Sequence, residues 1–279
     1  MRRKVKLLCC CFLLTAVPAG ASAAGDDVAQ LKQVVSTQEN TLGKAHPELA
    51  AALSKLAACY VAQERYAEAE PLYWRAVEIY DKAAEKYAAE RAAILSSLAE
   101  LHHLHGKQAE AESLYERVLR IQEKALPKNH PDLAVTMDKL AGLYQNQRRY
   151  VEAESLYARA MAVKEKNLGK EHSEVGAELG KLAGLHWQIG QPKEAESLQL
   201  RDMAIDEKTL GKDHPHLAKD FAKLATSYQT RGRWTEAASA YQNALTILKA
   251  KFPAGHPDIE PLEAEYDQVK KRLIAEQTE

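Results

Sequence analysis

Glycine, proline and aromatic residues are scarce in this chain of 279 residues, which has 13 Gly, 10 Pro and 6% Phe, Trp and Tyr. Sandwiches and barrels need turn residues at regular intervals, so this scarcity argues against an all-β fold. An excess of either charge is also lacking, because 38 Lys and Arg stand against 39 Asp and Glu. This balance excludes the basic surface of a dedicated nucleic-acid-binding protein. With 46% hydrophobic residues, a helical globular body is expected.

Apolar runs of membrane-spanning length are lacking as well. The stretch from Leu7 to Val17 is too short to cross a bilayer, which needs about 20 apolar residues. It follows four basic residues and precedes Ala21-Ser22-Ala23, a pattern typical of a secretory signal peptide. We therefore predict that residues 1–23 are cleaved and that residues 24–279 are periplasmic or secreted, with no stable membrane insertion. Lipid attachment at Cys9–Cys11 is the less favoured alternative, because the apolar run continues beyond Cys11.

Outside that stretch, Cys59 is the only cysteine in the sequence. A single Cys cannot form an internal disulfide, so the exported domain must be stable through its core. Because Cys59 lies beside the core position of Tyr60, we expect a buried, unreactive thiol. The motifs GxSxG, HExxH, GxGxxG and the P-loop are absent from the sequence. We therefore predict no catalytic residues, no cofactor and no enzymatic activity.

What the sequence does have is a repeat of 42 residues, which is the first pattern to seek in any chain. Histidine recurs on this spacing, at His46, His130, His172, His214 and His256. Four further columns share the period: Leu56-Ala57, Leu98-Ala99, Leu140-Ala141, Leu182-Ala183 and Leu224-Ala225; Tyr60, His102, Tyr144, His186 and Tyr228; Ala69, Ala111, Ala153, Ala195 and Ala237; and Tyr73, Tyr115, Tyr157, Gln199 and Tyr241. Five coincident columns do not arise by chance.

Within each repeat the apolar spacing is helical, as Leu53, Leu56, Ala57 and Tyr60 follow i, i+3, i+4, i+7. A short polar break separates this run from a second one, so each repeat is interpreted as a helical hairpin. Leu-Gly marks the end of the second helix, and His-Pro three residues later marks the start of the next hairpin. Successive histidines therefore belong to successive hairpins, where we expect them to cap and pack rather than bind one metal ion.

The order of apolar residues resembles the tetratricopeptide repeat, and the longer unit, with LGKxHP and RYxEAExLYxRA, is similar to the kinesin-light-chain-like subfamily. Residues 149–160 are the clearest copy, and the resemblance covers about residues 28–260. It implies an all-α fold, a right-handed α-solenoid of helix-turn-helix hairpins. We expect a helix over 26–42, five hairpins over about 47–252 and a capping helix over about 257–277. The first helices are expected near 47–62, 89–104, 131–146, 173–188 and 215–230.

One segment departs from this pattern. The Gly and His-Pro signals are missing at residues 84–92, so the second helix of the first hairpin is expected to continue there.

The resemblance also implies that the first helix of each hairpin lines a concave groove. Candidate groove residues lie between the core columns of these helices: Lys55, Lys139, Lys181 and Lys223 in one column, and His103, Gln145, Trp187 and Gln229, with Asn146 and Gln188 beside them, in another. Kinesin-light-chain-like repeats often carry asparagine on this face, which can hold an extended peptide by its backbone. Lysine in the first column favours an acidic or carboxylate-terminated partner. A merely solvated face, partly balanced by Glu100 and Asp138, is the alternative.

The sequence therefore predicts an exported scaffold that binds a protein or peptide partner in its groove. A structural spacer or oligomerisation scaffold without a groove ligand is the runner-up. Metal binding at His103 and His105 is a remote third, because His102 belongs to the core column and leaves only these two rings available.

Overall fold

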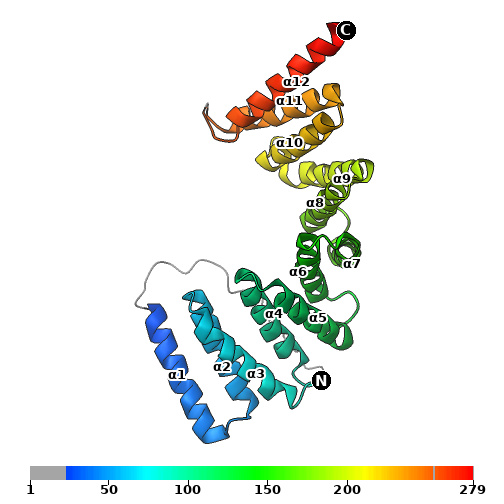
Figure 1. The fold of residues 1–279 in the computed structure, drawn as a ribbon. Helices are drawn as coiled ribbons and strands as arrows, with labels where there is room; N and C mark the ends of the chain where they lie inside the picture. Colours follow the sequence, from blue (N-terminus) through cyan, green and yellow to red (C-terminus); the bar gives the residue numbers. More distant parts are fainter. Residues whose placement is uncertain (1–22, 254, 279) are drawn as a thin grey trace, which may run out of the picture. The chain divides into compact units, whose positions relative to one another are not determined.

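The computed structural model describes residues 23–253 and 255–278, and every regular element in these ranges is a helix (Figure 1). The signal peptide expected over residues 1–23 lies, apart from its last residue, outside the described residues. The helices are α1 (Ala23–Leu42), α2 (Pro47–Ala62), α3 (Tyr66–Asp81), α4 (Ala88–Leu104), α5 (Gln108–Ala125), α6 (Pro131–Asn146), α7 (Tyr150–Leu168), α8 (Ser173–Gln188), α9 (Pro192–Leu210), α10 (Pro215–Thr230), α11 (Trp234–Lys251) and α12 (Glu260–Thr278). The expected first helices differ from α2, α4, α6, α8 and α10 only at the start of α4, which begins one residue earlier.

The helices pack as two compact units, one up to Ile94 and one from Leu95 onward. In the first unit α2 packs against both α1 and α3. In the second unit α6 pairs with α7, α8 with α9, and α10 with α11, and α12 packs on α11 (Figure 1). Each pair is joined by a turn of three residues, so its two helices run antiparallel.

The repeat columns form the cores of both units. Every member of the alanine column is fully buried, so neighbouring helices approach closely there. The two aromatic columns are also buried, including the positions where His102, His186 and Gln199 replace Tyr. The structure thus confirms that these columns are packing positions, and a larger residue in the alanine column would overpack the interface.

His46, His130, His172 and His214 cap first helices, as expected, whereas His256 precedes a turn over residues 257–259, and the C-terminal helix expected from about 257 begins at Glu260. In His46, His130, His172, His214 and His256, ring Nδ1 accepts a hydrogen bond of 3.2–3.3 Å from the backbone N–H two residues later. These N–H groups have no partner within the helix, so the imidazole supplies the acceptor that Ser or Asp usually provides. Proline follows the histidine at four of these five positions, and Pro47, Pro131 and Pro215 occupy the first turn of a helix.

The expectation that the second helix of the first hairpin continues through residues 84–92 is wrong. Helix α3 ends at Asp81, residues 82–87 form turns, and α4 begins at Ala88. Arg91 reaches back from α4 to the Asp81 carboxylate at 2.6 Å and to the carbonyl of Ala84 at 3.2 Å. Side-chain bonds therefore hold this turn without the Gly or Pro on which the prediction relied.

Candidate functional site

The lysine column does not form a bare cationic surface. Lys55 lies exposed on α2 in the first unit, and the other three lysines lie on first helices of the second unit. Each of those three is paired within the chain: Lys139 with Glu100 at 3.1 Å, Lys181 with Glu178 at 2.7 Å and Asp138 at 3.0 Å, and Lys223 with Asp220 at 2.9 Å. An acidic partner would have to compete with these carboxylates.

The amide column carries hydrogen bonds on the same helices. Gln145 accepts a hydrogen bond from the Tyr157 hydroxyl at 3.1 Å, and its own NH₂ donates to Gln188 at 2.9 Å, which links α6 to α8. Gln229 likewise accepts a hydrogen bond from the Tyr241 hydroxyl at 2.7 Å, but its NH₂ donates to Glu265 of α12 at 3.3 Å. These bonds orient the amides of Gln145 and Gln188, and Gln188 and the neighbouring Asn146 are exposed.

Trp187 interrupts that network. It stands at the repeat position of Gln145 and Gln229, and Gln199 stands at the position of Tyr157 and Tyr241. In this repeat the amide and the aromatic side chain have therefore changed places. Trp187 is half-buried, and the Arg231 guanidinium lies over its ring at 5.3 Å. This stacking covers part of the Trp187 ring, so less of this candidate groove residue is available to a partner.

His103 and His105 do not form a metal site with any described neighbour. His103 is exposed and its Nδ1 lies 3.1 Å from the side-chain oxygen of Gln108, whereas Nδ1 of His105 lies 2.9 Å from the backbone oxygen of Leu101. Within residues 23–253 and 255–278, no further His, Cys or carboxylate completes a three-donor group with them.

Cys59 on α2 is half-buried, and burial, with a smaller contribution from Asp27, raises the pKa of its thiol. Cys59 is therefore less buried than expected, while its raised thiol pKa disfavours the thiolate of a reactive cysteine.

A buried charge network joins α6, α7 and α8. Nζ of Lys164 lies 2.9 Å from the Asp138 carboxylate and 2.5 Å from the Glu178 carboxylate, and Lys181 contacts the same two acids. Burial raises the pKa of Glu178, whose side chain is completely enclosed. The pKa of Lys164 is also raised, because its hydrogen bonds to the two carboxylates outweigh its desolvation. Two cations here balance two anions.

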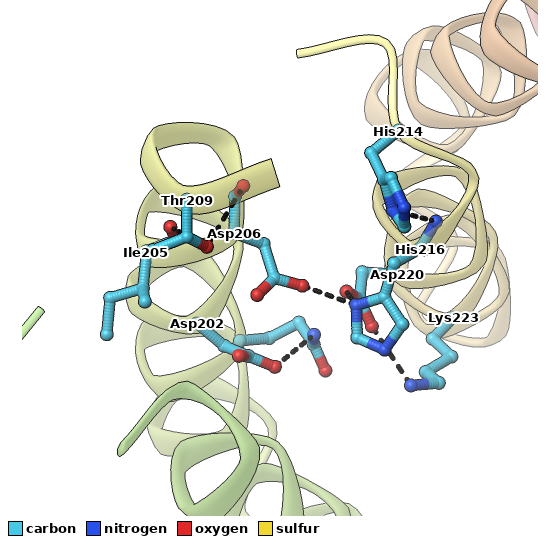
Figure 2. A network of polar contacts seen from close by, with 9 residues as sticks. Asp202, Ile205, Asp206, Thr209, His214, His216, Asp220 and Lys223 are labelled. Atoms are coloured by element: carbon cyan, nitrogen blue, oxygen red, sulfur yellow. Dashed lines mark hydrogen bonds and ion pairs between the residues drawn. The ribbon is translucent and has the colours of Figure 1, made fainter. Parts of the chain in front are cut away.

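The corresponding contact between α9 and α10 is an acidic cluster (Figure 2). Asp202 and Asp206 of α9 face His216 and Asp220 of α10, and all three carboxylates are buried. Nδ1 of His216 contacts the Asp206 carboxylate and lies 3.5 Å from Oδ2 of Asp220. Donor atoms of Asp206, His216 and Asp220 all lie within 4.8 Å of one another, which makes these residues the candidate metal ligands of the described chain.

Asp202 is the most strongly perturbed member of this cluster. Burial, followed by the charges of Asp220 and Asp206, raises its pKa to about 7, although His216 and Lys223 act in the opposite direction. Its carboxylate lies against α8, where a Cβ at Gly176 or Gly180 would come within 2.8 or 2.9 Å of its oxygens. The two helical glycines therefore make room for an acid at an apolar position.

None of the residues in this cluster is among the sites predicted from the sequence, although the repeat carries a signal for it. The column of Asp202 otherwise holds Ala76, Val118, Ala160 and Ala244, and Asp206 occupies the position of Lys164. An acid in an apolar column is an anomaly that a column-by-column comparison finds. Its partners on α10 follow only from knowing which helix faces which.

Two open cavities lie elsewhere in the second unit. One of about 480 Å³ lies between α5 and α7, with Leu140 and Tyr144 of α6 at its base and Val151, which is 78% exposed, at its rim. The other, of about 320 Å³, lies between α10 and α12 over Tyr241. In the described part of the chain, no helix is both long and apolar enough to span a bilayer.

Comparisons with known proteins agree with this fold. A family model described as tetratricopeptide repeat matches residues 28–82, 48–124, 90–166, 132–201 and 174–250. No curated protein matches the chain. Two crystal structures of kinesin-light-chain TPR-like repeats from Podosopora anserina are similar. One is 32% identical with a TM-score of 0.59, over 67% of this chain and 88% of that one. The other is 30% identical with a TM-score of 0.63, over 75% and 99%.

A more distant structure, BtubC (BKLC) from P. vanneervenii, is 21% identical with a TM-score of 0.66 and covers 84% of this chain and 92% of its own, which shows a shared fold. The repeat columns, the helix pairs and the matches over residues 28–250 lead to one conclusion. This chain belongs to the tetratricopeptide repeat family, with repeats of the kinesin-light-chain-like kind.

Proposed function

We propose that the chain is an exported, non-catalytic scaffold that binds an extended segment of a protein or peptide along the first helices of its second unit. Tetratricopeptide arrays are generally scaffolds for protein partners, and the fold itself does not name the partner. The observation that carries the proposal is the oriented amide network of Gln145 and Gln188, with exposed Asn146 beside it. Amides held in this way can donate to and accept from a peptide backbone.

The partner's charge is the second part of the proposal. Because the lysines of α6, α8 and α10 are paired with acids of the chain itself, we place recognition of the peptide backbone above recognition of acidic side chains. An acidic or carboxylate-terminated partner remains the alternative, and it requires Lys139 or Lys223 to exchange its partner. Salt distinguishes the two, since screening at high ionic strength weakens an exposed ionic contact and leaves amide hydrogen bonds largely in place.

A pair of amide substitutions tests this face. In Asn146→Ala/Gln188→Ala we expect at least about a tenfold loss of partner binding, equivalent to about 1.4 kcal/mol, measured with the partner captured from the native organism. The matched control is Gln242→Ala/Asn243→Ala, which removes the same two amide types from exposed positions on α11. The control should bind as wild type does, and binding should persist in about 0.5 M salt.

Equal binding by both variants would contradict use of this face. Export has its own readout in the same preparation, because the captured protein should come from outside the cytoplasm and begin at Ala24. Recovery of the uncleaved chain from the cytoplasm alone would contradict export.

A spacer or oligomerisation scaffold is the second candidate. The apolar cavity between α5 and α7, with Val151 at its rim, is the observation that favours it. Concentration-dependent self-association that Val151→Lys abolishes, with no partner lost in the amide variant, would support this role instead.

A further inference from the structure

Two successive helix contacts in the second unit carry opposite charges at one position of the repeat. Between α7 and α8, Nζ of Lys164 lies between the carboxylates of Asp138 and Glu178. One repeat later, Asp206 occupies the position of Lys164, and Asp220 occupies that of Glu178. The contact between α9 and α10 therefore keeps a buried acid and replaces the cation that would neutralise it with a second acid.

The side chains at this contact place three possible cation ligands close together. Asp206 projects from α9, and His216 and Asp220 project from one face of α10 at i, i+4 spacing (Figure 2). The Asp220 side chain is only 1% exposed. Its Oδ2 accepts no hydrogen bond, although it lies close to the ligand atoms of Asp206 and His216. A buried carboxylate oxygen without a hydrogen bond is costly unless something else neutralises it.

The charges inside the chain do not balance. Asp202, Asp206 and Asp220 carry up to three negative charges, and the nearby cations are Lys223, 2.9 Å from Asp220, and His216 when it is protonated. When His216 is neutral, Lys223 alone offsets Asp206 and Asp220, so these two carboxylates keep a net negative charge whatever the protonation of Asp202. At the α7–α8 contact, by comparison, Lys164 and Lys181 offset both acids.

We propose that Asp206, His216 and Asp220 bind a divalent transition-metal ion that takes the place of the lysine found one repeat earlier. One imidazole and two carboxylates suit Zn²⁺ or Mn²⁺ better than Ca²⁺ or Mg²⁺, which prefer oxygen ligands alone. Three protein ligands leave room for water in a fourth position, and His216, which is about half exposed, gives the ion access from solvent. The ion would join α9 to α10, and hence the fourth hairpin to the fifth.

The test is zinc binding to the full chain, measured by calorimetry and by thermal unfolding with Zn²⁺ or with a chelator. Wild type should bind one equivalent at this site, and excess Zn²⁺ should raise its melting temperature by about 5 °C. Asp206→Asn should lose that equivalent and the shift. Glu207→Gln, an exposed acid next to the cluster, is the matched control and should keep both.

Asp206→Lys makes the test independent of any loss of folding. It restores the residue type found at position 164, so this variant should bind no zinc at the site and should melt, in chelator, near the temperature of zinc-loaded wild type. Equal zinc binding by wild type and Asp206→Asn would overturn the proposal. The proposal would also be overturned if neither Zn²⁺ nor Mn²⁺ changed the melting temperature of wild type while Asp206→Asn melted at a higher temperature than wild type. Protons alone would then neutralise the cluster.

Discussion

Replacing Lys164 with methionine is expected to lower the free energy of unfolding by about 3 kcal/mol, because breaking a buried ion pair leaves an uncompensated charge. Glu178 is completely enclosed, and its remaining cation, Lys181, is more exposed than Lys164. Methionine keeps the length and packing of the lysine stem, so lost volume contributes little. The measurement is urea-induced unfolding followed by circular dichroism at pH 7.

Two further variants separate charge from packing in this prediction. Lys164→Met/Glu178→Gln should recover most of the loss, because it removes the stranded anion together with its partner. Lys166→Met, on the exposed surface of the same helix, should stay within about 0.5 kcal/mol of wild type. A double variant as unstable as Lys164→Met would show that the ion pair is not the cause.

Replacing Asp202 with asparagine is expected to stabilise the protein by about 2 kcal/mol at pH 8, because the pKa of Asp202 is raised to about 7 in the folded chain, mainly by burial. The folded state therefore holds a proton that the unfolded state releases above about pH 4. Stability from this group is fully present below that pH and is lost as the pH rises through about 7. Asparagine has no charge to bury, so the gain from the substitution grows between pH 5 and pH 8.

Unfolding of wild type and Asp202→Asn by urea at both pH values, in chelator, measures this gain. The groups that face Asp202 are Asp206 on its own helix and Asp220, His216 and Lys223 on α10, and they are the same in both proteins. Asp213→Asn, which changes an exposed acid in the turn between α9 and α10, is the control and should show no pH-dependent gain. A difference between wild type and Asp202→Asn that is the same at pH 5 and pH 8 would contradict the assignment.

The repeat made the helices and their caps predictable. The columns of Ala69 and Tyr60 indicate which helix faces are buried, and His-Pro indicates where a first helix begins. Both patterns could be recognised because they depend on residues within one hairpin. The turn at residues 82–87 was not predictable, since Arg91 and Asp81 hold it through side-chain contacts rather than through turn residues.

The charges of the candidate face were harder to predict, because they depend on which helices become neighbours. Arg149 pairs with Glu112, Arg201 with Glu165 and Arg233 with Glu196, at separations of 36 or 37 residues that the 42-residue columns do not display. The partners of Lys139 and Lys181 follow the same logic. The sequence located the first helices and offered Glu100 and Asp138 as acids that balance the lysines, and the structure pairs Lys139 and Lys181 with them. Lys223 pairs with Asp220, three residues earlier on its own helix.

The central claim, that a partner binds along the first helices of the second unit, is tested most directly by site-specific photo-crosslinking in the native organism. A photoreactive residue would replace Asn146 on α6 or Gln188 on α8 and, for comparison, Val151 on α7 or Asn243 on α11, all of which are exposed. We expect one protein species to crosslink at positions 146 and 188 and not at 151 or 243. Crosslinks at 151 or 243 with none at 146 and 188 would place the partner on the second helices and contradict the proposed function.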